Sequence, residues 1–208
     1  MMGICYIVGA GDFYGEIKLT EEDLLIAADG GLDTLRSVGL SPDLLIGDLD
    51  SLHGAAGDLP LLRHPVEKDE TDMYLAYLEG ARRGYTSFRI YGGVGGRLDH
   101  TFANLSLLIY GKRRGHDLTL VDSGMTVTAL KKETATLKGE PGLGFSLLAF
   151  DGAAHGVTIE GAKYEAKNAT LSPEFPLGVS NSLTDAPARI TVTDGELLLM
   201  LDDRAIKA

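Results

Sequence analysis

Hydrophobic residues before about residue 123 form short runs, separated by segments whose apolar positions recur with helical spacing. The runs that predict strands are 4–9, 24–29, 43–48, 88–93 and 117–122, and the segments that predict helices are 32–39, 71–84 and 98–113. Gly39, Gly84 and Gly115 end these helical patterns, as a C-terminal capping glycine does. Apolar strands that alternate with helices predict a mainly parallel sheet covered on both faces.

The pattern changes after residue 123. Segments 157–171 and 188–201 alternate or run as strands do, and no segment has convincing helical spacing. The pair Asp194-Gly195 predicts a hairpin turn. We therefore predict an α/β protein: an N-terminal three-layer, mostly parallel sheet domain at 1–123, followed by a C-terminal all-β domain at 124–208, a small sandwich or barrel.

Composition and charge narrow the function classes. The 208 residues carry a formal net charge of −11, which predicts no binding to nucleic acid or to anionic membranes. The basic cluster Lys112-Arg113-Arg114 is too small to change this and is interpreted as a solvated helix end. No apolar run approaches the roughly 18 residues of a membrane span. The single cysteine, Cys5, is interpreted as a buried hydrophobic residue, and we expect a reduced, cytoplasmic protein.

Charged residues gather where the predicted strands end and the next helices begin. In a parallel sheet these positions share one edge, which is where α/β proteins bind ligands. The residues concerned are Asp29, Asp48, Asp50, Asp69, Asp72, Arg97 and Asp99. If the sheet is parallel, we expect them to converge.

Several of these residues also have a purely structural explanation. Asp69 or Thr71 suits a helix cap, Asp72 suits the first turn of a helix, and Asp99 suits another cap. Asp29 precedes two glycines and suits a turn.

The pair Asp48 and Asp50 is harder to explain as a turn, because a turn needs only one aspartate. Two carboxylates this close repel each other unless a cation lies between them. Mg²⁺ prefers oxygen ligands and usually keeps positions for substrate phosphates. Together with Arg97, the carboxylates therefore predict a metal–phosphate site.

Two glycine-rich segments match no standard nucleotide-binding fingerprint. Segment 92–97, GGVGGR, lacks the Lys-Ser/Thr ending of a P-loop, and segment 9–11, GAG, is not followed by the third glycine of a dinucleotide-binding turn. Backbone N–H groups beside Arg97 nevertheless suit a polyphosphate. His100 lies in this region. The other histidines show no metal-ligand spacing and are interpreted as solvated or structural: His53, His64, His116 and His155.

Four segments of the N-terminal half resemble the thiamine pyrophosphokinase family, and they occur in the family's order: ADGGLDTL (28–35), PDLLIGDLDSL (42–52), KDETDMYLAY (68–77) and GGRLDHTFANL (95–105). A later segment, GVSNSL (178–183), resembles the family's thiamine-binding segment. It departs from the bacterial form, in which an acidic and an aromatic residue are expected where Ser182 and Leu183 stand.

The resemblance implies an α/β catalytic domain followed by a β-sandwich thiamine-binding domain. It also implies a homodimer whose active sites lie between the subunits. The implied reaction transfers the diphosphoryl group of ATP to the hydroxyethyl oxygen of thiamine and releases AMP, with Mg²⁺ as the cofactor.

The resemblance further implies a role for each candidate residue. The ligands of Mg²⁺ and the polyphosphate are Asp48, Asp50, Asp69 and Asp72. Arg97 offsets charge at the transferring group, and Asp99 positions nucleotide or substrate. Contacts to the nucleotide come from Asp29, Gly95, Gly96, Arg97, His100 and Asn104. Contacts to the aminopyrimidine end of thiamine come from Ser180 and Asn181, whose side chains offer donors and acceptors. Asn104 equally suits a buried polar contact, and Ser180-Asn181 also suits a simple turn.

Two other function classes remain open at this stage. A Mg²⁺-dependent phosphohydrolase with a nucleophilic aspartate predicts water as the acceptor, but it leaves segments 68–72 and 97–99 unexplained. A non-catalytic thiamine- or nucleotide-binding module requires a damaged site, whereas all four N-terminal segments are intact.

Overall fold

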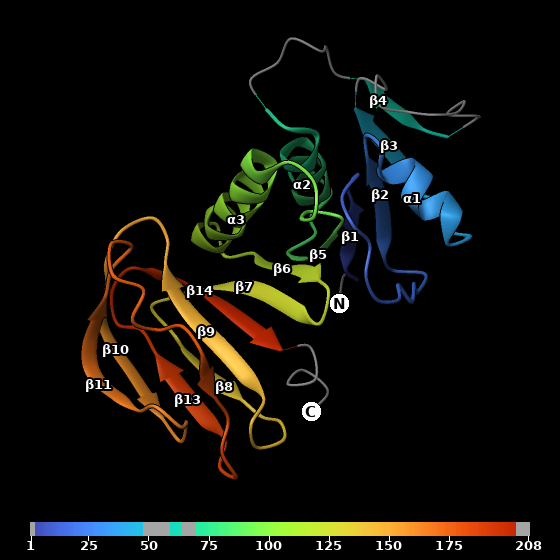
Figure 1. The fold of residues 1–208 in the computed structure, drawn as a ribbon. Coiled ribbons are helices and arrows are strands. Elements are labelled where there is room, and N and C mark those ends of the chain that lie inside the picture. The colour runs from blue at the N-terminus through green and yellow to red at the C-terminus, as the bar shows by residue number, and fades with distance from the viewer. Residues whose placement is uncertain (1–2, 48–58, 64–69, 203–208) are drawn as a thin grey trace. The chain divides into compact units, whose positions relative to one another are not determined.

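The computed structural model describes residues 3–47, 59–63 and 70–202 (Figure 1). The chain divides into two compact units, one made of residues 1–107 and 115–123 and the other of residues 108–114 and 124–208. Five residues discussed above lie outside the described part of the chain: Asp48, Asp50, His53, His64 and Asp69.

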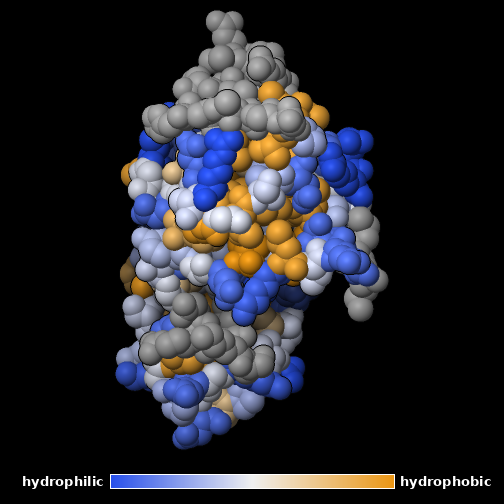
Figure 2. Space-filling view, turned by 90° about the vertical axis from the view of Figure 1, so that its right-hand side faces the viewer, coloured by the Kyte–Doolittle hydropathy of each residue, from blue (hydrophilic) through white to orange (hydrophobic). Residues whose placement is uncertain are grey.

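The described residues contain three helices, α1 (Gly31–Ser37), α2 (Asp72–Arg82) and α3 (Leu98–Arg113). None of these helices has the length and apolar character needed to cross a membrane. On the face shown in Figure 2, hydrophobic residues gather in the middle of the view and hydrophilic residues lie around them.

The first unit contains a parallel sheet with the strand order β6-β5-β1-β2-β3-β4. Its strands are β1 (Cys5–Val8), β2 (Leu24–Ala28), β3 (Leu44–Gly47), β4 (Leu61–Arg63), β5 (Ser87–Tyr91) and β6 (Asp117–Asp122). All residues of β1, β2 and β3 are buried, which explains their continuous apolar runs. The five predicted strands are confirmed. The edge strand β4 was missed because three residues are too short to form a pattern.

Helices cover both faces of this sheet. Leu32 of α1 and Leu25 of β2 belong to one buried cluster on the first face. On the other face α2 approaches β1 so closely that a Cβ added to Gly80 would lie 2.7 Å from the Cys5 sulfur. Figure 1 shows α1 and α2 on opposite sides of the strands. The predicted three-layer arrangement is therefore confirmed.

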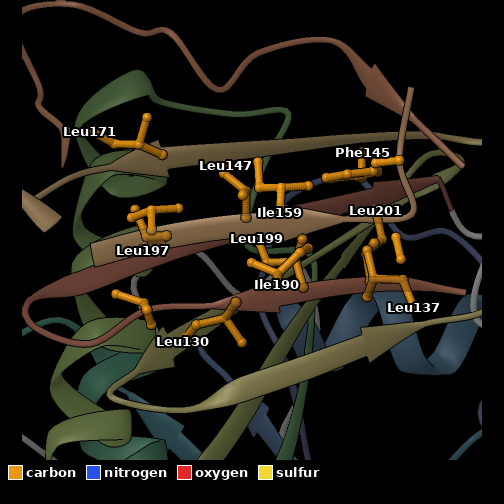
Figure 3. Close-up of a cluster of buried hydrophobic side chains, with 14 of the residues drawn as sticks. Leu130, Leu137, Phe145, Leu147, Ile159, Leu171, Ile190, Leu197, Leu199 and Leu201 are labelled. Carbon is orange, nitrogen blue, oxygen red and sulfur yellow. The ribbon is translucent and has the colours of Figure 1, made fainter. Parts of the chain in front are cut away.

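The second unit is a sandwich of two antiparallel sheets, β12-β9-β14-β7 and β11-β10-β13-β8. The strands are β7 (Met125–Lys131), β8 (Thr134–Leu137), β9 (Gly144–Ala149), β10 (Ala154–Glu160), β11 (Ala166–Leu171), β12 (Asn181–Ser182), β13 (Ala188–Thr191) and β14 (Glu196–Asp202). Leu147 and Leu199 of one sheet share a buried cluster with Ile159 and Ile190 of the other (Figure 3). Of the two predicted forms, the unit is a sandwich.

The predicted hairpin at Asp194-Gly195 is wrong. Strand β13 pairs with β10 and β8, whereas β14 pairs with β7 and β9, so this turn carries the chain from one sheet to the other. The N–H of His155 donates to the Asp194 carbonyl at 2.8 Å, and Gly195 has φ +86°. The dipeptide specifies a tight turn, but it does not specify which sheet the next strand joins.

The basic cluster Lys112-Arg113-Arg114 lies at the end of α3 as predicted, and Arg113 and Arg114 are exposed, but two of its three cations have acidic partners that were not predicted. Lys112 pairs with Glu133 at 3.0 Å, and Arg113 pairs with Glu196 at 2.9 Å and with Asp151 at 2.8 Å. Because these partners belong to the second unit, they explain why residues 108–114 are part of that unit. Sequence spacing placed the three cations at a helix end but gave no sign of acidic partners 20 to 80 residues away.

Candidate active site

The carboxyl ends of β1 and β3 and the loop that follows β2 meet closely at the edge of the parallel sheet. A Cβ added to Gly31 would lie 1.9 Å from the Val8 carbonyl oxygen, so only glycine fits there. Asp29 has φ +48°, and its N–H donates to the Ile46 carbonyl at 2.8 Å. A Cβ on Gly47 would lie 3.1 Å from the Asp29 Cα. Asp29 is thus fixed beside the end of β3, the strand that Asp48 follows directly in the sequence.

A second contact joins the loops after β1 and β5. The N–H of Gly11 donates to the Gly92 carbonyl at 2.9 Å, and the N–H of Asp12 donates to the Val94 carbonyl at 3.1 Å. A Cβ on Gly11 would lie only 2.2 Å from the Val94 carbonyl oxygen. The segment 9–12 therefore packs directly against the glycine loop 92–96 and is joined to it by two hydrogen bonds. Sequence reasoning set this segment aside because it fails the dinucleotide fingerprint.

The glycine loop turns its carbonyl groups toward the rest of the unit. The carbonyl oxygens of residues 92 and 94 accept from the loop after β1, and that of Gly93 accepts from Asn104 Nδ2 at 2.7 Å. The N–H groups of residues 93–96 donate to no other atom of the described residues. Successive N–H groups left available in a glycine-rich turn form a binding place for an anion such as a phosphate.

Arg97 and Asp99 follow this loop as an ion pair. The Arg97 guanidinium donates to both Asp99 carboxylate oxygens, at 3.1 Å from Nε and at 2.6 Å from a terminal nitrogen. The Arg97 guanidinium holds the pKa of Asp99 below its usual range. Both side chains are exposed. Two of the five guanidinium N–H groups are used in this pair, so the remaining three can donate to a phosphate.

The start of α3 differs in one detail from the expectation. The helix begins at Leu98, so Asp99 lies inside the first turn and does not cap the helix. Its Oδ1 accepts the N–H of His100 at 3.0 Å. Gly95, Gly96 and His100 are exposed, whereas Asn104 is buried with 6% exposure.

Helix α2 begins as expected. Thr71 caps it by accepting the N–H of Tyr74 at 3.2 Å, and Asp72 lies in the first turn. Asp72 is the one predicted metal ligand that the structure describes. Among the described residues, no three His, Cys, Asp or Glu side chains lie close enough together to hold a metal ion. The predicted Mg²⁺ ligand set therefore depends on Asp48, Asp50 and Asp69.

In the second unit, Asn181 acts as a clamp on a neighbouring turn. Its Oδ1 accepts the N–H of Tyr164 at 3.0 Å and that of Ser182 at 2.8 Å, and its Nδ2 donates to the Tyr164 carbonyl at 2.8 Å. The side chain is buried with 7% exposure. Ser180 is exposed, has φ +64° and donates its N–H to Ser146 Oγ at 3.1 Å. Of the two predicted thiamine-contact residues, Ser180 is the exposed one.

Leu183 stands where an aromatic residue is expected in the bacterial form of the family segment, and the structure shows where its side chain lies. Leu183 is 4% exposed and belongs to the buried cluster of the sandwich. Its N–H donates to the Leu143 carbonyl at 2.9 Å. A leucine at this position therefore packs into the core.

The two described histidines outside the α3 region have structural partners. Tyr77, which is fully buried, places its hydroxyl 2.9 Å from His116 Nδ1. His155 Nδ1 lies 3.2 Å from Thr170 Oγ1.

Two family models match this chain. The thiamin pyrophosphokinase catalytic domain matches residues 17–120, and the thiamin pyrophosphokinase vitamin B1 binding domain matches residues 134–197. The chain belongs to the thiamin pyrophosphokinase family.

Relatives with known names and structures agree with the family assignment. A curated thiamine pyrophosphokinase of Bacillus subtilis is 28% identical over 189 residues, which is 86% of this chain and 87% of the relative. The crystal structure of a Bacillus subtilis thiamine pyrophosphokinase has a TM-score of 0.87 at 26% identity, covering 96% of this chain and 99% of that one. A Geobacillus thermodenitrificans thiamin pyrophosphokinase has a TM-score of 0.84 at 27% identity, covering 97% and 98%.

A distant relative shares the fold alone. The yeast thiamin pyrophosphokinase structure has a TM-score of 0.77 at 17% identity, covering 99% of this chain and 88% of that one. The fold is thus shared with a thiamin pyrophosphokinase structure of widely different sequence.

The residues of the thiamin pyrophosphokinase segments divide into two groups. In the first unit Asp29, the loop 92–96 and Arg97 lie on loops at the carboxyl edge of the sheet, following β2 and β5. Asn104 and Asn181 are buried, and both hold backbone groups. The sequence alone could not predict these roles for Asn104 and Asn181, because nothing in one sequence distinguishes an asparagine that binds a ligand from one that binds the backbone.

Proposed function

We propose that this protein is a thiamine pyrophosphokinase, which transfers the diphosphate of ATP to the hydroxyethyl oxygen of thiamine and releases AMP. The observation that carries the proposal is the glycine loop 92–96, in which the carbonyl groups of residues 92–94 accept hydrogen bonds while the loop's N–H groups remain available beside Arg97. The matches to both family domains and the similarity to the Bacillus subtilis thiamine pyrophosphokinase support it.

The polyphosphate of ATP binds along this loop. N–H groups of Gly95 and Gly96 donate to phosphate oxygens, and Arg97 offsets the charge of the transferring group. Asp99 keeps the guanidinium in place through its two hydrogen bonds. Asp29 and His100 contribute nucleotide contacts from the edge of the site.

Mg²⁺ is the proposed cofactor, held by Asp48, Asp50, Asp69 and Asp72. A donor set of four carboxylates without nitrogen or sulfur suits this hard cation, and Asp72 already lies in the first turn of α2. When bound, the ion neutralises phosphate charge and orients the polyphosphate.

Thiamine binds near Ser180 in the second unit. The Ser180 hydroxyl is proposed as a donor and acceptor for the aminopyrimidine, while Asn181 shapes the neighbouring turn. The permanent positive charge of the thiazolium ring is attracted by a protein of net charge −11.

The chemical step is a displacement at the β-phosphorus of ATP. The hydroxyethyl oxygen of thiamine forms a bond to that phosphorus while the bond to the α,β-bridging oxygen breaks. AMP leaves with the electron pair, and an aspartate carboxylate of the site accepts the hydroxyl proton. Such transfer depends on positioning and on charge stabilisation, which are the properties of an anchored loop and an arginine.

The proposal also covers the roles of the two domains and the oligomeric state of the protein. We assign catalysis to residues 1–123 and thiamine binding to residues 124–208, in a cytoplasmic homodimer whose active sites lie between subunits. The hydrophobic patch among hydrophilic residues in Figure 2 is the type of surface that mediates contact with another protein. Sedimentation velocity of the purified protein at several concentrations tests the dimer.

The test of the function is the identity of the nucleotide product. The protein is incubated with ATP, Mg²⁺ and thiamine, and AMP that forms only when thiamine is present supports the proposal. ADP would indicate a simple kinase, and phosphate release without thiamine would indicate the hydrolase alternative. An Asp48→Asn variant is expected to lose turnover while keeping its fold, and near-normal rates in that variant would overturn the proposed metal site.

A further inference from the structure

We propose that Asn104 is a positioning residue, which fixes the glycine loop 92–96 in the conformation that binds polyphosphate and does not contact the nucleotide. This inference rests on the proposed function, because it assigns phosphate binding to that loop. It chooses between the two roles that sequence left open for Asn104, a nucleotide contact and a buried polar contact.

The side chain of Asn104 is engaged on the protein side of the loop. It is 6% exposed, and its Nδ2 donates to the Gly93 carbonyl at 2.7 Å. A Cβ on Gly93 would lie 3.2 Å from this Nδ2 and 2.5 Å from Leu120 Cδ1, so the loop rests directly on α3 and β6. A buried amide in this position has little freedom to reach a ligand.

The bond from Asn104 completes a set of three anchors. The carbonyls of Gly92 and Val94 are held by backbone N–H groups of residues 11 and 12, from the β1 side. The carbonyl between them is held by Asn104, from the α3 side. Because each carbonyl shares a peptide plane with the N–H of the next residue, holding the carbonyls of residues 92–94 restricts rotation of three planes and fixes the orientation of the N–H groups of residues 93–95.

Removal of the amide donor would release the middle anchor. The Gly93 carbonyl is buried, and a buried acceptor without a donor is strongly unfavourable. The loop is then expected to rotate so that this carbonyl reaches water, which turns N–H groups away from the phosphate position. Glycine loops rotate easily because several of their residues have no Cβ.

Two variants and a control test this role. Asn104→Ala removes the donor, and Asn104→Asp keeps the shape but replaces the donor with an acceptor. Leu107→Ala is the control, because Leu107 lies on the same helix as Asn104 and is also buried, with 3% exposure. All variants are first compared with the native protein by circular dichroism and thermal unfolding.

The first measurement needs no ligand. Amide hydrogen exchange of residues 11 and 12 reports on the loop, because these N–H groups donate to its carbonyls. We expect exchange at residues 11 and 12 to accelerate roughly tenfold in both Asn104 variants relative to the control variant. Equal exchange in all three variants would overturn the anchoring role.

The second measurement is binding of α,β-methylene ATP and of AMP, by calorimetry. Both Asn104 variants should bind α,β-methylene ATP roughly tenfold or more weakly than native protein, while AMP, which lacks the β and γ phosphates, should lose little affinity. Equal losses for both nucleotides would indicate a general nucleotide contact and would overturn the inference. Unchanged affinity in the variants would overturn it as well. Failure of the native protein to bind either nucleotide would instead refute the proposed function, and the phosphate role of Asn104 with it.

Discussion

Substitution of Gly11 by alanine tests whether the two interlocked loops form the nucleotide site. Gly11 has no positive φ, so alanine is compatible with its backbone conformation. The added methyl group would nevertheless lie 2.2 Å from the Val94 carbonyl oxygen and 2.7 Å from that of Gly92. The substitution therefore acts by pushing the two loops apart.

The size of the effect follows from this overlap. A Cβ needs at least 3.0 Å from such an oxygen, so the loops must separate by 3.0 − 2.2 = 0.8 Å. Such a movement weakens the two hydrogen bonds that join Gly11 to Gly92 and Asp12 to Val94. At about 0.5–1.5 kcal/mol each, their loss lowers the free energy of unfolding by about 1–3 kcal/mol. A misplacement near 1 Å at a reacting centre reduces kcat/KM by about 100-fold.

The assay compares denaturant unfolding and steady-state kinetics for native protein, Gly11→Ala and Gly144→Ala. Gly144 is a suitable control because its φ is not positive and the nearest atom to an added Cβ is 4.0 Å away. We expect Gly144→Ala to retain native stability and native KM for ATP. If Gly11→Ala loses stability but keeps native kcat/KM, the loops are a structural feature only, and the reasoning that makes them the phosphate site is refuted.

Three further predictions follow from buried groups. Glu79 is 6% exposed, and hydrogen bonds from Arg82 and Arg83 lower its pKa from 4.5 to about 2. The ionised Glu79 therefore contributes its full stabilisation of the folded protein above pH 4.5, and this contribution is lost as the pH falls toward 2. Because solvent screens the exposed Arg82, we expect the free energy of unfolding to fall by only about 1–2 kcal/mol in acid. If Glu79→Gln loses as much stability in acid as the native protein, this prediction is contradicted. Burial raises the pKa of the Cys5 thiol to about 12, so iodoacetamide should label it at pH 8 only in denaturant, and rapid labelling of native protein would contradict its burial. Asn181→Ala removes two hydrogen bonds to Tyr164 and one to Ser182. It should lower the free energy of unfolding by about 2 kcal/mol and raise the KM for thiamine, and a variant with native stability by calorimetry would contradict the structural role given to Asn181.

The fold was largely predictable because burial leaves a local pattern. Strands buried on both faces read as continuous apolar runs, and the change from helical to strand spacing after residue 123 matches the start of β7 at Met125. Pairings between distant segments leave no such pattern. For this reason the turn at 194–195 was assigned to a hairpin, although the strands on its two sides belong to different sheets.

The position of the candidate residues at strand ends was predictable from sequence, whereas the contacts that hold them were less so. Strand-end placement brought Asp29 and Arg97 to one edge, and the structure has both on loops at the carboxyl ends of strands. The contact between segments 9–12 and 92–96 joins residues about 80 positions apart, and only their glycines hinted at close approach. Helical spacing likewise could not tell that Asn104 points to a backbone carbonyl.

The most direct test of the account follows the β-phosphorus of ATP. The protein is given ATP labelled at this position, together with Mg²⁺ and thiamine, and the labelled products are separated. Displacement at the β-phosphorus predicts that the label moves entirely into thiamine diphosphate while unlabelled AMP forms in equal amount. Label recovered in ADP or in free phosphate, whether or not thiamine is modified, would contradict the account.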